Sequence, residues 1–131
     1  MEEKWIEYKN ILIPKGTYEI VEVIQNFEGT KITLESDTFK ATILFEFADS
    51  VRMSDEGRRI KTYQESEGLQ TYRKSFNGNP IYIVENSLFN KWMIEESAGI
   101  YTDSTHYAIV TMNDIVDVLS YQEPIINVER T

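Results

Sequence analysis

The chain contains no cysteine, so the sequence rules out disulfide scaffolds, zinc–thiolate sites and thiol catalysis. Long hydrophobic runs are also missing, and no window approaches the roughly 18 apolar residues that suggest a membrane-spanning helix. The first ten residues, MEEKWIEYKN, mix acids and bases and lack the apolar run of a signal peptide. We therefore expect a cytoplasmic protein that does not enter a membrane.

Histidine occurs once, as His106. A transition-metal site built on histidine usually needs a second nitrogen or sulfur ligand, and a catalytic triad needs a serine or cysteine beside its histidine. No serine sits in the Gly-x-Ser-x-Gly motif of hydrolases, and the phosphate-binding, dinucleotide-binding and metalloprotease motifs are missing too. The sequence therefore predicts no cofactor, no metal and no catalytic residue. We interpret His106 as a strand-edge or surface side chain.

Basic residues are scarce, because 13 lysines and arginines stand against 22 acids and leave a net charge of −9. Bases outnumber acids only in residues 52–84, and the segments on either side are strongly acidic. Most of such a surface repels a phosphate backbone, so nucleic-acid binding is not expected. It attracts a cationic protein partner, although many proteins are acidic for solubility alone.

The length of 131 residues fits a single domain, residues 1–131, and the aromatic content of 12% favours β structure. The clearest period lies in TFKATILFEFA, residues 38–48, which predicts a half-buried antiparallel strand. Its apolar face consists of Phe39, Ala41, Ile43, Phe45 and Phe47. Residues 17–27 and 31–35 are predicted to pair through a turn at Glu28-Gly29-Thr30. Residues 69–76 and 81–85 flank Asn77-Gly78, which indicates another hairpin.

One helix is predicted in ENSLFNKWMIEESAG, residues 85–99. Asn86 or Ser87 can cap its start, and Gly99 can end it in a left-handed conformation. An apolar stripe at helical spacing is expected to pack in the core. It consists of Leu88, Phe89, Trp92 and Met93. Glu95 and Glu96 oppose the helix dipole in the last turn, so they either pair with arginines of the middle segment or serve a function.

The segment THYAIVTMNDIVDVLS, residues 105–120, predicts two strands that meet at Asn113-Asp114, and a helix over part of it is the alternative. Asp114 fits the turn. Asp117 interrupts an apolar face, so it either pairs with an arginine or that face meets solvent or a partner. The charged segment SDEGRRIKTYQESEG, residues 54–68, is predicted to be a solvated connection, with a binding loop as the alternative.

Three stretches carry a resemblance: ILFEFADSVRMSDEGRRIKT, VENSLFNKW and HYAIVTMNDIVDVLS. Together they resemble a family of small, poorly characterised proteins of Gram-positive bacteria, over about residues 38–120. Proteins of this size and charge in such bacteria include immunity proteins, which bind and neutralise a toxin domain. The resemblance implies a binding role and carries over no catalytic residue.

We therefore expect a mainly β (α+β) fold, an antiparallel sandwich or curled sheet of about seven to eight strands with one covering helix. The leading hypothesis is a non-enzymatic protein-binding module, such as an immunity protein that neutralises a basic toxin domain. The predicted partner-binding residues are Glu95, Glu96, Asp103, Asp114 and Asp117. A small-molecule-binding β-domain or a carboxylate-based enzyme is the alternative, and an oligomerising domain is the third reading.

Overall fold

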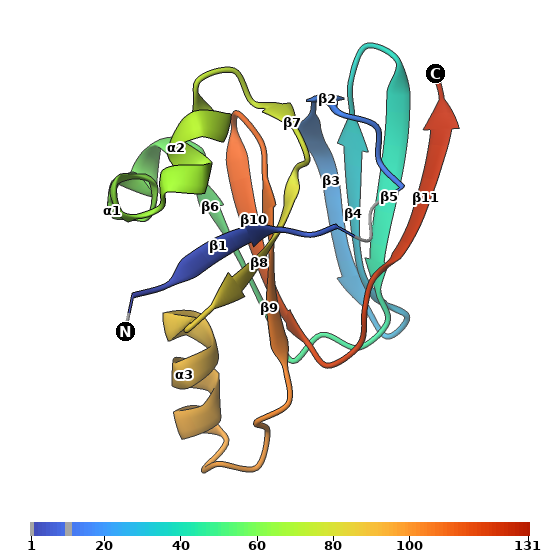
Figure 1. The fold of residues 1–131 in the computed structure, drawn as a ribbon. Helices are drawn as coiled ribbons and strands as arrows, with labels where there is room; N and C mark the ends of the chain where they lie inside the picture. The colour runs from blue at the N-terminus through green and yellow to red at the C-terminus, as the bar shows by residue number, and fades with distance from the viewer. Residues whose placement is uncertain (1, 10–11) are drawn as a thin grey trace.

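The structure is a computed structural model that describes residues 2–9 and 12–131, where the chain forms an antiparallel sheet of five strands and another of four (Figure 1). The central sheet consists, in spatial order, of β1 (Lys4–Glu7), β8 (Ile81–Glu85), β9 (Thr105–Val110), β10 (Asp114–Ser120) and β6 (Ser50–Asp55). The outer sheet consists, in spatial order, of β11 (Ile125–Arg130), β5 (Phe39–Phe45), β4 (Gly29–Glu35) and β3 (Glu19–Asn26). A separate short pair is formed by β2 (Gly16–Thr17) and β7 (Asn77–Gly78).

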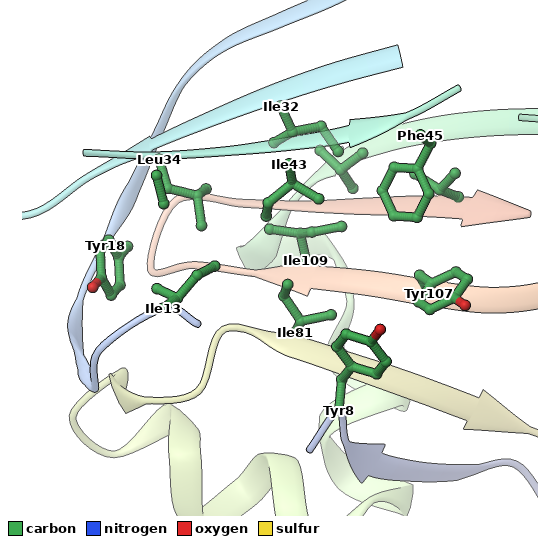
Figure 2. Close-up of a cluster of buried hydrophobic side chains, with 13 residues drawn as sticks. Tyr8, Ile13, Tyr18, Ile32, Leu34, Ile43, Phe45, Ile81, Tyr107 and Ile109 are labelled. Atoms are coloured by element: carbon green, nitrogen blue, oxygen red, sulfur yellow. The ribbon is translucent and has the colours of Figure 1, made fainter. Parts of the chain in front are cut away.

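The two sheets pack face to face over an apolar core, so the predicted mainly β fold is confirmed. Figure 2 shows Ile43 and Phe45 of the outer sheet lying opposite Tyr107 and Ile109 of the central sheet. The alternating face predicted around β5 is correct as far as Phe45. Phe47 lies beyond the strand and is 52% exposed.

The opposite face of the central sheet is covered by helices that the sequence did not predict. They are η1 (Glu56–Arg58), α1 (Ile60–Glu65) and α2 (Glu67–Arg73) (Figure 1). Tyr63 of α1 and Leu69 and Tyr72 of α2 pack with side chains of β8, β9 and β10 in a second apolar cluster. The predicted strand over residues 69–76 is wrong, because Leu69 and Tyr72 enter this cluster from one face of a helix. Asn77 and Gly78 pair with β2 and do not close a tight hairpin.

The strands β9 and β10 pair as predicted around Asn113-Asp114, and the helical alternative for residues 113–120 is wrong. Every residue of β10 after Asp114 is buried, because the outer sheet covers one face of this strand and the helices cover the other. Asp117, in the middle of β10, is therefore fully enclosed.

The predicted helix is α3 (Leu88–Glu96), which extends with its following loop from one end of the central sheet (Figure 1). The Ser87 hydroxyl caps its start, and Gly99 follows its end with a φ of +80°. The predicted core stripe holds only in part: Phe89 is buried, whereas Leu88 and Trp92 are 59% and 48% exposed. Within the described residues, no helix is long and apolar enough to cross a bilayer.

Candidate functional site

The most concentrated polar chemistry of the described residues is a buried charged cluster around Asp117. Oδ2 of this residue accepts hydrogen bonds from Arg52 Nε at 2.8 Å and from Arg59 Nη1 at 2.9 Å. Oδ1 lies 2.7 Å from Nε2 of His106, and Nδ1 of the same imidazole lies 2.6 Å from the Ser87 hydroxyl. We call Arg52, Arg59, Ser87, His106 and Asp117 the Asp117 cluster.

Strand register explains how these side chains meet. Asp117 pairs directly with Arg52 of β6 on one side and with Ala108 of β9 on the other. His106 stands two residues from Ala108, so it projects from the same face of the sheet. Arg59 enters from the junction between η1 and α1, and Ser87 from the cap of α3. The cluster therefore ties α1 and α3 to the central sheet.

His106 is not the surface or strand-edge residue that the sequence suggested, because it is 1% exposed. Its ring lies edge-on to Trp5 and Phe89, at centroid distances of 5.9 and 5.6 Å. When the imidazole is neutral, the Ser87 hydroxyl can donate to Nδ1 while Nε2–H donates to Asp117. Both ring nitrogens are then satisfied, which suits a buried histidine.

Asp117 is ionised at neutral pH. Burial by itself raises the pKa of this carboxyl, but the hydrogen bond and the electrostatic interaction with His106, followed by the charges of Arg59 and Arg52, outweigh burial and hold the pKa well below its usual range. Arg59 is the more enclosed cation, with 14% of its side chain exposed against 44% for Arg52. The arginine pairing that the sequence offered as one reading of Asp117 is confirmed.

Hydrogen bonds link Ser87 to His106 and His106 to Asp117, as in the triad of a serine hydrolase. A cavity of about 400 Å³ borders Ser87 and His106. Two features oppose catalysis. The Ser87 oxygen accepts the N–H of Asn90 at 2.9 Å as a helix cap, and the residue is only 5% exposed. The charge of Asp117 is shared with two guanidiniums, so less of it supports the imidazole as a base. The geometry favours a structural role for the cluster.

The five predicted partner-binding residues lie in three different places. Glu95 and Glu96 are exposed at the end of α3, and Asp103 is exposed in the loop after it. Asp114 is half-buried at the turn between β9 and β10. Asp117 is 0% exposed, so its side chain does not reach a partner at the surface. Three of the five therefore lie on α3 and the loop that follows it.

The middle segment is not only a solvated connection. Asp55 caps a turn by accepting the N–H of Gly57, but Arg59 points inward to Asp117. The predicted pairing of Glu95 or Glu96 with a middle-segment arginine is absent among the described residues, where Arg73 binds Glu56. In the same part of the chain, no group of three or more acidic or histidine side chains is placed to hold a metal ion.

Sequence reasoning missed the Asp117 cluster because its members are far apart in the chain. Asp117 lies 65 positions from Arg52 and 58 from Arg59. The signal that could have found it is the one aspartate inside an otherwise apolar strand, since a buried acid needs cationic partners.

A comparison of the chain with protein-family models, with curated proteins and with solved structures gives no match in any of the three. The resemblance to immunity-type proteins of Gram-positive bacteria therefore stays a prediction. The site is interpreted from its geometry and chemistry.

Proposed function

We propose that this chain is a non-enzymatic protein-binding domain that docks a basic protein through α3 and the loop that follows it. We call this surface the α3 face. It consists of Leu88, Trp92, Glu95, Glu96, Ile100, Tyr101 and Asp103. The observation that carries the proposal is that large apolar side chains lie exposed here beside three acids.

Helical spacing places the anchors on one side of α3. Leu88, Trp92 and Glu95 stand at positions i, i+4 and i+7, a spacing that puts side chains on one stripe of a helix and serves helix recognition by partner proteins. Ile100 and Tyr101, in the loop after α3, are also exposed, at 75% and 54%. Aromatic side chains of this kind supply most of the binding energy at protein interfaces.

Charge selects the kind of partner. Glu95, Glu96 and Asp103 form no ion pair within the described residues, and only Lys91 brings a positive charge to α3. The net charge of −9 adds a long-range attraction for a cationic protein. Neutralisation of a basic toxin domain in the cytoplasm of a bacterium is the concrete form of this proposal.

A binding role also fits the interior better than catalysis does. The core between the sheets is built of apolar side chains, and the carboxylate of Asp117 is paired within its own cluster. Ser87, the hydroxyl hydrogen-bonded to His106, is engaged as a helix cap. Covalent labelling of Ser87 by a fluorophosphonate probe would count against the non-enzymatic part of the proposal.

The α3 face is tested by a triple variant, Trp92→Ala with Glu95→Lys and Glu96→Lys. Wild type and variant are immobilised side by side, and basic proteins that each retains from the host's secreted fraction are identified. We expect at least one basic protein on wild type that the variant loses. After purification of that protein, calorimetric titration should show at least a 30-fold weaker affinity, since loss of one buried aromatic anchor removes about 2 kcal/mol or more.

A matched control carries the same kinds of change on the exposed face of the outer sheet: Ile125→Ala with Glu22→Lys and Glu35→Lys. All three residues are exposed, and the added charge equals that of the α3 variant. The control should bind as wild type does. Equal retention by wild type and the α3 variant, or capture of no basic protein by wild type, contradicts the proposal.

A further inference from the structure

Two adjoining hollows lie beside Arg52, between β6 and the helices, and they differ in chemistry. The first, of about 360 Å³, is lined by Arg52, Arg59 and Lys61. The second, of about 480 Å³, is lined mainly by apolar side chains, among them Phe89 and Trp92. Arg52 and Leu88 line both hollows, so the two adjoin, with a cationic end and an apolar end. We call the two hollows together the β6–α3 groove.

The cationic end is already ordered without a ligand. Arg52 donates Nε to Asp117, and its guanidinium lies 4.3 Å from the centre of the Phe89 ring. Arg59 is fixed by bonds to Asp117, Ser54 and Thr62. Among the described residues, the two terminal nitrogens of Arg52 have no hydrogen-bond acceptor. A fixed guanidinium binds an anion at a lower entropic cost than a mobile side chain does.

Charge in the groove suits a single negative group. The two guanidiniums outweigh the one charge of Asp117 that holds them. Lys61 adds a positive charge beside them, but Glu3 and Glu65 line the same hollow and offset the remaining positive charge. The attraction for an anion is therefore local to the terminal nitrogens of Arg52, and a multiply charged anion is repelled by the two acids. A carboxylate therefore fits this end better than a phosphate ester, and its two oxygens match the planar fork of an arginine.

The apolar end fixes the rest of the ligand. Leu88 and Trp92 are 59% and 48% exposed, and Trp92 stacks on Phe89 with ring centroids 5.9 Å apart. Val51 of β6 also lines this hollow. A flat hydrocarbon body attached to the carboxylate can cover these side chains while its head stays on Arg52.

We propose that the β6–α3 groove binds a small monocarboxylate with an apolar, preferably aromatic, body. The head pairs with the terminal nitrogens of Arg52 beside Arg59, and the body lies against Trp92 and Leu88. This inference goes beyond the proposed protein-binding function and does not depend on it. The two surfaces share Leu88 and Trp92, but Glu95 and Glu96 take no part in lining the groove.

Phenylacetate is the probe. Two matched ligands serve as controls: phenylacetamide lacks the negative charge, and acetate lacks the aromatic body. Binding is followed by amide chemical shifts of the ¹⁵N-labelled chain. We expect shifts at Arg52, Leu88 and Trp92 with phenylacetate, and at least about tenfold weaker binding of the two matched ligands, since the charged hydrogen bonds and the apolar contact each contribute that much. Equal binding of phenylacetate and phenylacetamide, or no shift in the groove, overturns the proposal.

Variants separate this site from the rest of the molecule. Arg52→Gln should weaken phenylacetate binding at least about tenfold, whereas Arg58→Gln, an exposed arginine outside the groove, should not. Because Arg52 also binds Asp117, Trp92→Ala serves as the second variant, since this exposed side chain can be removed without opening the core. Unchanged phenylacetate binding by Trp92→Ala would show that the apolar end of the groove does not hold the ligand. Glu95→Lys with Glu96→Lys should keep phenylacetate binding even where it loses a protein partner, so the two proposals can fail separately.

Discussion

The Asp117→Asn variant is expected to lose about 3–5 kcal/mol of its free energy of unfolding, because removal of one partner from a buried ion pair leaves the other charge uncompensated. Asparagine has nearly the same shape, so the loss reports charge and not packing. Arg59 is 14% exposed and loses its only ion pair among the described residues. Arg52 is 44% exposed, so solvent screens it and it contributes less to the loss.

The matched control for this change is Asp114→Asn, on the same strand. The bonds that hold the turn at Asp114 use its backbone N–H and C=O, which asparagine retains. The control should therefore change stability by no more than about 0.5 kcal/mol, as surface substitutions usually do. Urea unfolding of wild type and both variants at pH 7 measures the difference. Equal stability of Asp117→Asn and wild type would show that the charges of the cluster do not hold the fold together.

The second large effect is a loss of stability in acid that depends on Asp117. The pKa of this carboxyl lies below its usual value in the folded chain, so folding favours the ionised form. Its contribution is fully present above the unfolded pKa of about 3.9 and is lost as the pH falls from there through the folded pKa. Wild type should therefore lose up to about 1.4 kcal/mol per pH unit in this window on account of this one group.

Urea unfolding at several values between pH 5 and the most acid pH at which the chain stays folded measures this effect. The stability difference between wild type and Asp117→Asn should be constant near neutrality and should shrink as the pH falls below about 4. A difference that stays constant over the whole acid range would mean that Asp117 has the same pKa folded and unfolded, and that outcome contradicts the cluster described here.

Much of the framework could be predicted from local patterns. The alternation at Phe39, Ala41, Ile43 and Phe45 indicated β5, and the apolar run after Asp114 indicated a strand that is now seen to be covered on both faces. Ser87 and Gly99 marked the two ends of α3 because capping and left-handed residues are local signals. These features need only neighbouring residues, so the sequence shows them directly.

The features that the sequence did not predict depend on contacts between segments far apart in the chain. Charges over residues 54–68 hid α1, in which Tyr63 is the one buried residue among those described. The helix α2 was missed because residues 69–76 were predicted to be a strand. His106 was placed at the surface because nothing near it in sequence can satisfy a buried imidazole. Ser87 and Asp117 do so from other elements. The sequence indicated an arginine partner for Asp117, but only the register of β6 against β10 shows that Arg52 is such a partner.

The Asp117 cluster and the α3 face have different tasks in this account. The cluster joins Ser87 at the start of α3 to the central sheet through His106, so it fixes the helix from which the exposed side chains project. The α3 face offers those side chains to a partner. Loss of binding without loss of stability is therefore expected from changes on the surface, and loss of stability from changes in the cluster.

The central claim is that a buried carboxylate in the central sheet is ionised and is held there by two arginines and a histidine. It is tested most directly by following the ¹³C signal of the Asp117 carboxyl group by NMR as the pH is lowered from 7 to about 3. The account predicts that this signal stays at the position of an ionised carboxylate down to about pH 3, below the usual aspartate pKa of about 3.9. A protonation step at or above about 3.9 would contradict it.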